Sequence, residues 1–319
     1  MAQTPPVRKL VACSAVVVVL AACGGQASSS DAAPPSTSVI PGLPGSWSAV
    51  IDPKAIPLGD GAVSTEPSRG EIYSCRTDFG GGGPSHGGPW INTAAGTWDA
   101  TSKVVVRGEN TWPQAVYQER VEGATRVITT NDLPTQQVTG DFPVALDDPA
   151  HQYDPNPNGI SAHEVELRLP AEPKAAAQPG CVPMGAVGIL KNGVFLYNGL
   201  DATGDDAAAH EAQDVCDGHP DQSHSYHYHN IPSCLLDAVP DEQGAYLVGY
   251  ALDGYGIYVE RDAHGNPPTN GDLDECHGRT STVEADGKPQ AVYHYSASVE
   301  FPYTTGCFHG IPTAAPGQH

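Results

Sequence analysis

Basic residues are scarce in this sequence. The 319-residue chain has 15 Lys and Arg against 37 Asp and Glu, a formal net charge of −22 at pH 7. A surface of this sign repels the phosphates of nucleic acids and the headgroups of anionic lipids. We therefore expect no nucleic-acid partner. The charge suits a soluble exported protein or a cation-binding protein, without indicating which cation.

Several enzyme signatures are also missing. The sequence contains no Gly-x-Ser-x-Gly, no Ser-His-Asp signature and no dinucleotide-binding fingerprint, which argues against serine hydrolases and dehydrogenases. Its one long apolar run, residues 10–22, is shorter than the roughly 20 residues that span a bilayer. With 36 Gly and 30 Pro, the chain favours many turns and few long helices.

The N-terminal segment resembles an export signal. Arg8 and Lys9 precede the apolar run, which ends in Leu20-Ala21-Ala22-Cys23-Gly24, similar to a bacterial lipobox. This resemblance predicts a lipoprotein signal peptide at 1–22 and a lipidated Cys23 that anchors the chain to the outer face of the bacterial cell membrane. An ordinary secretory signal would change the anchoring but not the export. Without residues 1–22, 13 basic residues face 37 acidic ones, a charge of −24.

Residues 23–45 are rich in Gly, Ser, Ala, Pro and Thr, so they bury too little apolar surface to fold and predict a disordered tether. Residues 46–319 are expected to form a single β-rich domain. Two hairpins are indicated by Asn192-Gly193 and Asp253-Gly254, each between apolar runs and each typical of a type I′ turn. A third hairpin is expected around Glu122-Gly123.

The fold class expected is mainly β, a compact disulfide-braced domain with one or few short helices. The best helix candidate is 205–215, with an alanine run inside. Six cysteines remain beyond Cys13 and Cys23, and an even number in an exported chain predicts disulfides, although six allow fifteen pairings. We favour Cys216–Cys234 and Cys276–Cys307, which close short loops, with Cys75–Cys181 left over. The alternative is cysteine thiolates as zinc ligands.

The richest stretch for chemistry is 216–234, with four histidines, two cysteines, two tyrosines and two aspartates. If Tyr226–His229 is a strand, His227 and His229 project to one face and the two tyrosines to the other. Two such imidazoles can share a zinc or copper ion, with His219 completing the shell. The alternative is a disulfide-closed loop whose histidines make structural hydrogen bonds.

A weaker copy of this motif occurs later in the chain. Cys276-His277-Gly278-Arg279 echoes Cys216-Asp217-Gly218-His219, and Tyr293-His294-Tyr295-Ser296 echoes Tyr226–His229. We interpret the echoes as two strand-loop units facing one another across a common site. His294 is then the equivalent of His227 and the fourth predicted metal ligand. Just upstream, Glu211 and Asp217 are candidates for a general base in metal-assisted hydrolysis.

Taken together, these motifs resemble the bacterial YHYH-domain family over about 141–310. The resemblance is carried by Ala209-His210-Glu211, Cys216-Asp217-Gly218-His219-Pro220, Tyr226-His227-Tyr228-His229, Gly249-Tyr250-Ala251-Leu252-Asp253-Gly254-Tyr255, Leu273-Asp274-Glu275-Cys276-His277-Gly278 and Gly306-Cys307-Phe308-His309-Gly310. It implies export and no particular activity. The second half of such proteins usually has a full Tyr-His-Tyr-His, where this chain has Ser296.

Three functions are compatible with these observations. The first is an exported metal-binding protein that uses His219, His227, His229 and His294. The second is a metal-dependent hydrolase with Glu211 or Asp217 as its base. The third is a metal-free binding or structural module on the cell surface.

Overall fold

A computed structural model describes residues 1–2, 51–80 and 87–314. The chain divides into two compact parts, 1–37 and 38–319, and all the described residues except Met1 and Ala2 belong to the second. The expected lipidation site Cys23 and the tether 23–45 lie outside the described residues, as does all but the first two residues of the signal peptide. No helix within 51–80 or 87–314 is long and apolar enough to cross a membrane.

The described part of the chain is mainly β, as predicted. Its largest sheet has eight strands, in the order β14 (Gly218–Pro220), β15 (Tyr226–Tyr228), β13 (Phe195–Tyr197), β12 (Ala186–Leu190), β16 (Gly244–Ala251), β17 (Gly256–Arg261), β19 (Lys288–Ser296) and β18 (Gly278–Ala285).

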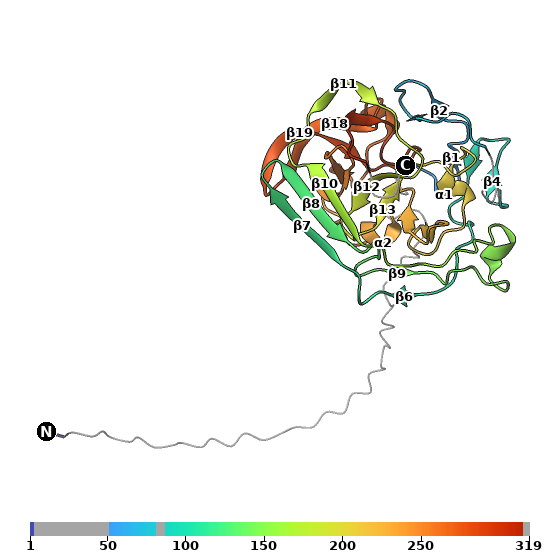
Figure 1. The fold of residues 1–319 in the computed structure, drawn as a ribbon, viewed down its shortest axis with the longest axis horizontal. Helices are drawn as coiled ribbons and strands as arrows, with labels where there is room; N and C mark the ends of the chain where they lie inside the picture. Colours follow the sequence, from blue (N-terminus) through green and yellow to red (C-terminus); the bar gives the residue numbers. More distant parts are fainter. Residues whose placement is uncertain (3–50, 81–86, 315–319) are drawn as a thin grey trace, which may run out of the picture. The chain divides into compact units, whose positions relative to one another are not determined.

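A three-stranded sheet, in green on the left of Figure 1, contains β10 (Val165–Pro170), β8 (Thr125–Thr130) and β7 (Tyr117–Glu122). The smaller sheets pair β1 (Ile56–Pro57) and β4 (Ile91–Asn92) with β5 (Thr97–Trp98), β11 (Ala175–Gly180) with β20 (Phe308–Gly310), β2 (Val63–Ser64) with β3 (Ile72–Tyr73), and β6 (Asn110–Thr111) with β9 (Val138–Thr139). Helices are short: α1 (Ala207–His210), α2 (Ser233–Leu236) and the 3-10 turns η2 (Pro149–Gln152) and η3 (Asn270–Asp272).

The large sheet is an internal repeat. In its first half, defined as β12–β15, the hairpin β12–β13 is followed by β15 parallel to β13 and by β14 antiparallel to β15. The second half, β16–β19, has the same arrangement, with β19 parallel to β17 and β18 antiparallel to β19. The halves join through the antiparallel pair β12–β16. The predicted repeat therefore exists, but its units lie side by side in one sheet and do not face each other across a site.

All three predicted disulfides are present, Cys75–Cys181, Cys216–Cys234 and Cys276–Cys307. The three hairpins are also confirmed. The expected type I′ turns at Asn192-Gly193 and Asp253-Gly254 are wrong. In each of these turns only the glycine has a positive φ, 94° at Gly193 and 88° at Gly254. Gly193 N donates to Leu190 O, as in a type I turn followed by a glycine bulge.

The expected helix at 205–215 is much shorter, because α1 ends at His210. Tertiary hydrogen bonds draw the next residues into an extended path: Ala212 N donates to Asp154 Oδ2 at 3.0 Å, and Val106 N donates to Gln213 O at 2.9 Å. His210 and Asp214 therefore do not share a helical face, and His210 lies against Asp60 instead.

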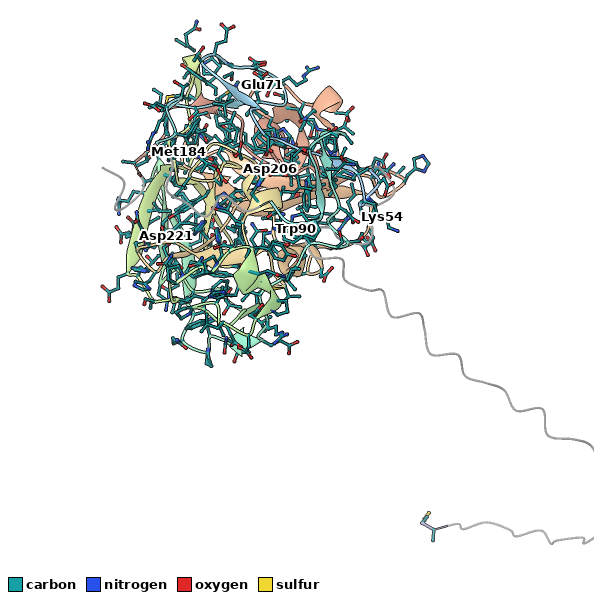
Figure 2. All side chains as sticks on the ribbon, turned by 90° about the vertical axis from the view of Figure 1, so that its right-hand side faces the viewer. Lys54, Glu71, Trp90, Met184, Asp206 and Asp221 are labelled. Atoms are coloured by element: carbon teal, nitrogen blue, oxygen red, sulfur yellow. A yellow bond between two sulfur atoms is a disulfide. The ribbon has the colours of Figure 1, made fainter. Side chains whose placement is uncertain are left out.

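Buried side chains hold α1 in place at both ends. Trp90 Nε1 donates to Ala209 O at 2.8 Å, and Asp206, fully buried, accepts from Gly59 N at 2.9 Å and from the Tyr303 hydroxyl. Figure 2 labels Trp90 and Asp206 near this helix. These contacts anchor the segment that carries Glu211 to the body of the protein.

Candidate metal centre

Three predicted histidines come together at the outer edge of the first half. His219 on β14 lies directly opposite His227 on β15, and His229 comes immediately after β15, two residues beyond His227. Directly opposed residues in an antiparallel pair have Cβ atoms about 5 Å apart, and residues two apart share a face. The three rings therefore converge, and all three residues are less than 7% exposed, at 6%, 3% and 3%.

The tyrosines occupy the opposite face, as the alternation predicts. Tyr226 and Tyr228 are fully buried and pack edge to face, with ring centroids 5.3 Å apart. Each hydroxyl is used by the framework: Tyr226 donates to Asp214 at 2.8 Å, and Tyr228 lies 3.1 Å from Asn192 Nδ2. The period of two along β15 thus divides a packing face from a chemical face.

Hydrogen bonds orient the rings so that the Nε2 atoms point inward. His227 Nδ1 lies 3.2 Å from Ser225 O, and His229 Nδ1 lies 2.6 Å from Asn198 O. A carbonyl oxygen only accepts, so each Nδ1 carries the proton and each Nε2 of a neutral ring presents a lone pair. The two Nε2 atoms are 3.2 Å apart. Two lone pairs at this distance repel, so they require a shared proton or a bound cation between them.

Glu211 supplies a carboxylate to the same point. Its Oε2 atom lies 3.1 Å from His219 Nε2 and 3.1 Å from His229 Nε2. At a zinc–nitrogen distance of about 2.05 Å, tetrahedral ligand atoms are separated by roughly 3.3 Å. The three measured separations are close to this value. We call the four residues His219, His227, His229 and Glu211 the histidine centre. Three of the six separations between their ligand atoms are thus close to those of a tetrahedral site.

Unpartnered polar atoms fit the same interpretation. Among the described residues, Glu211 Oε2 and both ring nitrogens of His219 are buried and make no hydrogen bond of acceptable geometry. The ligand atoms of the three histidines all lie within 4.8 Å of one another, so this buried triad can hold a metal ion. Leaving such groups without partners is costly, and a cation satisfies them together.

The electrostatics favour one positive charge at the centre. Burial opposes ionisation of Glu211, but His219 and His229 outweigh it and hold the pKa of Glu211 well below its usual range. Burial, with additional repulsion from His219 and His229, lowers the pKa of His227 well below its ordinary value. The carboxylate is therefore ionised and His227 neutral, which are the forms that bind metal.

Glu211 is positioned by contacts on both sides of it. Asp154 holds the next residue by its backbone, as described above, and Lys103 Nζ donates to Ala208 O at 2.5 Å and to Gln213 Oε1 at 2.7 Å. Burial lowers the pKa of Lys103 to about 8, and nearby carboxylates including Glu211 oppose that shift. Sequence reasoning missed Lys103 and Asp154, because nothing local connects them to a residue 57 or more positions away.

A third missed residue, Tyr197, covers one face of the His227 ring. The two rings stack with centroids 3.8 Å apart and an angle of 19°, and the Tyr197 hydroxyl donates to Asp221 at 3.0 Å. Tyr197 ends β13, the parallel neighbour of β15. Only the strand pairing, which the sequence does not reveal, brings it beside His227.

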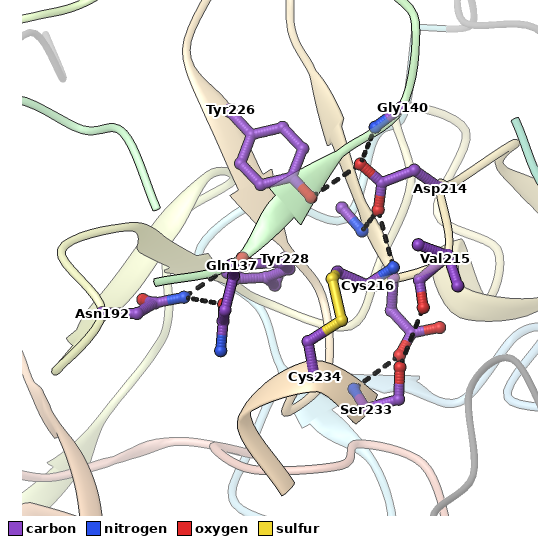
Figure 3. Close-up of a disulfide and its surroundings, with 12 residues drawn as sticks. Gln137, Gly140, Asn192, Asp214, Val215, Cys216, Tyr226, Tyr228, Ser233 and Cys234 are labelled. Atoms are coloured by element: carbon purple, nitrogen blue, oxygen red, sulfur yellow. Dashed lines mark hydrogen bonds between the residues drawn. A yellow bond between two sulfur atoms is a disulfide. The ribbon is translucent and has the colours of Figure 1, made fainter. Parts of the chain in front are cut away.

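The framework beneath the centre is shown in Figure 3. Asp214 accepts hydrogen bonds from Gly140 N at 2.7 Å, Cys216 N at 2.9 Å and the Tyr226 hydroxyl, while the Cys216–Cys234 disulfide crosses beside it. These bonds fix the start of β14 and with it the position of His219. Asp214 therefore serves the scaffold.

Two predicted site residues lie outside the centre. Asp217 accepts from Ser233 N at 2.8 Å, at the first residue of α2, and does not belong to the histidine group. His294 is on β19 in the second half, where its Nε2 lies 3.1 Å from Glu260 Oε1. Five strand spacings separate β15 from β19, or roughly 24 Å at about 4.8 Å each. The expectation that His294 joins His227 is corrected accordingly: pairing of β12 with β16 keeps the halves apart.

Comparison with known proteins points to one family. Residues 166–268 match a family model described as YHYH protein. The matched segment includes the first half of the sheet and the hairpin β16–β17 of the second. No curated protein and no solved structure matches the chain.

Proposed function

We propose that this protein is an exported, lipid-anchored metal-binding protein that holds one zinc or copper ion through His219, His227, His229 and Glu211. The observation that carries the proposal is the pair of facing Nε2 atoms of His227 and His229. Both rings donate from Nδ1 to carbonyl oxygens, so both lone pairs are free for a metal. Hydrogen bonds of this kind to the far nitrogen orient metal-binding histidines and raise their basicity.

The ligand set suits either metal. Three imidazoles and a carboxylate are typical ligands of zinc, whereas the general order of affinities favours copper at nitrogen-rich sites. Burial of the three imidazoles supports a closed, stably occupied site. The two metals differ in colour and spectroscopy, so one sample distinguishes them.

The experiment is metal analysis of the exported chain made without a histidine tag. A Cys23→Ser substitution releases it from the predicted anchor for purification. We expect elemental mass spectrometry to find a single zinc or copper ion per chain. The His227→Ala/His229→Ala variant is expected to contain none. Native protein that carries no metal and takes up none on titration would remove the proposal.

A metal-dependent hydrolase is the second function that the centre supports. Glu211 is the most exposed of its four side chains, at 13%, so a water molecule bound to a three-histidine metal would lie beside a carboxylate base. Glu211→Gln separates the two roles. If Glu211 is a ligand, the variant binds metal more weakly. If it is a base, the variant keeps the metal and loses hydrolysis of a panel of esters and phosphoesters.

Export and anchoring remain part of the proposal. Three disulfides support an oxidising compartment, because such bonds are rare in reducing cytosol. Mass spectrometry of the mature N-terminus tests it: we expect a diacylglyceryl-modified Cys23, and the Cys23→Ser chain should leave the membrane fraction. An N-terminus cut elsewhere would reduce the proposal to secretion without an anchor.

A further inference from the structure

The second half of the sheet contains a cluster whose strand positions correspond to those of the three histidines, although its carboxylate comes from β17 and not from the segment before β14. Strand register aligns Tyr228 with Tyr295, because each is paired with a glycine, Gly218 and Gly278. His294 then takes the place of His227 and Ser296 that of His229. Arg279 takes the place of His219, since each lies directly opposite the corresponding histidine.

The scaffold around the two positions is also repeated. Asp274 accepts from Cys276 N at 3.0 Å, Gly278 N at 3.0 Å and the Tyr293 hydroxyl at 3.2 Å. Asp214 makes the same three contacts in the first half, to Cys216, Gly218 and Tyr226. The repeat therefore extends to the hydrogen bonds that place the strands.

A buried carboxylate again lies at the meeting point. Glu260 Oε2 is 2.6 Å from Arg279 Nη2, and Glu260 Oε1 is 3.1 Å from His294 Nε2 and accepts a short hydrogen bond from Ser296 Oγ. We call these four residues the arginine centre. Glu260 thus contacts the three residues that correspond to the three histidines, as Glu211 contacts two of them.

The difference between the centres is the source of positive charge. His294 repeats the hydrogen bond of His227, since its Nδ1 lies 3.1 Å from the carbonyl oxygen two residues earlier, Val292 O. Its Nε2, however, faces a carboxylate and not another ring nitrogen. The Arg279 guanidinium approaches the same carboxylate through Nε and Nη2. A guanidinium is charged at any physiological pH, so Glu260 is neutralised without a metal.

From this correspondence we infer that the arginine centre is the second copy of the metal site, with the Arg279 guanidinium in place of the ion. The inference rests on the proposed function of the first half. It states that the chain binds one metal ion and not two, and that two side chains prevent the second half from binding another. Restoring imidazoles at 279 and 296 would give His294 and Glu260 the two partners they lack.

The test is the Arg279→His/Ser296→His variant, assayed for bound zinc by elemental analysis alongside the native chain. We expect one additional zinc ion per chain. The matched control Arg279→Lys/Ser296→His keeps a cation at 279 and should gain none. A folded Arg279→His/Ser296→His variant, with a native circular dichroism spectrum, that gains no zinc would overturn the inference.

The same variant in a His227→Ala/His229→Ala background separates this inference from the proposed function. Zinc bound there, with none bound by the native chain, would support the inference and refute the proposed function. Zinc bound by the native chain, with no gain from the restored histidines, would support the proposed function and refute the inference.

A measurement on the unaltered chain covers the case in which the variant does not fold. Chelator should raise amide hydrogen exchange in β14 and β15, where the metal is lost, and leave β18 and β19 unchanged. Equal increases in both pairs of strands would mean that the second half also loses a metal, and would overturn the inference.

Discussion

The two halves of the large sheet share a strand order, an equivalent disulfide and a set of hydrogen bonds to an aspartate, yet they neutralise a carboxylate differently. In the first half, two imidazoles contact Glu211, and the Nε2 lone pairs of His227 and His229 face each other. In the second, Arg279, His294 and Ser296 all turn toward Glu260. The second arrangement therefore contains its own cation, the Arg279 guanidinium.

This contrast separates the scaffold from the chemistry. The residues that repeat closely are those that pack or hold the backbone. They are Asp214 and Asp274, the cysteines and the tyrosines. The residues that differ lie on the opposite face of the strands, where His219 is exchanged for Arg279 and His229 for Ser296. The alternation of a β-strand allows this, because side chains on one face can change without disturbing the packing of the other.

The largest effect on metal affinity should come from placing in the first half the serine that the second half has at the position equivalent to His229. His229→Ser removes one of the two facing Nε2 atoms, so we expect metal affinity to fall by at least about a hundredfold, more than loss of a supporting residue costs. Competition with a chelating dye measures the change. Ser296→Ala is the matched control in the second half and should leave affinity unaltered. Equal affinity in native and His229→Ser chains would remove His229 from the ligand set.

The second effect is on folding stability. Glu260→Gln leaves Arg279 and His294 without their anion, and breaking a buried ion pair costs several kcal/mol. Because the Arg279 side chain is 37% exposed, we discount this to about 2 kcal/mol of unfolding free energy. Urea denaturation with and without chelator measures it. The loss should be the same in both conditions, and a loss that chelator abolishes would place Glu260 in a metal site.

Local patterns in the sequence predicted the parts of this comparison that depend on short-range physics. The alternation in Tyr226–His229 placed the histidines and tyrosines on opposite faces, and short loop closure indicated two of the three disulfides. The echo at Tyr293–Ser296 correctly paired His294 with His227. Each inference needed only the geometry of one strand or one loop.

The parts that failed depend on contacts between distant segments. The helix expected at 205–215 ends early because Asp154 and Val106 bond to the backbone beyond it. Because the helix ends early, Glu211 lies among the histidines as a candidate ligand. The sequence had suggested that Glu211 is a general base. Likewise, no local signal reveals that β12 pairs with β16, and it is this pairing that separates His294 from the histidine centre.

A smaller effect should follow from loss of the stacking ring. Tyr197→Leu removes the ring that stacks on His227, and we expect about a tenfold loss of metal affinity, the low end of what hydrogen-bonded supporting residues contribute. Tyr258 is its counterpart and packs edge-on to His294, with centroids 5.0 Å apart. Tyr258→Leu should therefore leave metal affinity unchanged. A similar loss in both variants, measured by dye competition, would indicate a general loosening of the sheet.

The smallest effect is a dependence of stability on pH that belongs to the second half. Burial would raise the pKa of Glu260, but hydrogen bonds from His294, Arg279 and Ser296 outweigh it and lower the pKa to about 2. The folded state therefore favours the ionised form more than the unfolded state does, in which the pKa is near 4.5. The resulting stabilisation is complete above pH 4.5 and is lost as the pH falls toward 2.

At pH 4 only a part of this stabilisation is gone, under about 1 kcal/mol by linkage. Other carboxylates titrate in the same range, so the quantity to measure is the difference between native protein and Glu260→Gln in chelator-treated samples. That difference in unfolding free energy should be constant from pH 7 to 5 and shrink below pH 4.5. A difference that stays constant to pH 3 would mean that the Arg279 guanidinium does not hold Glu260 ionised. The charge balance that distinguishes the two halves would then have to come from elsewhere.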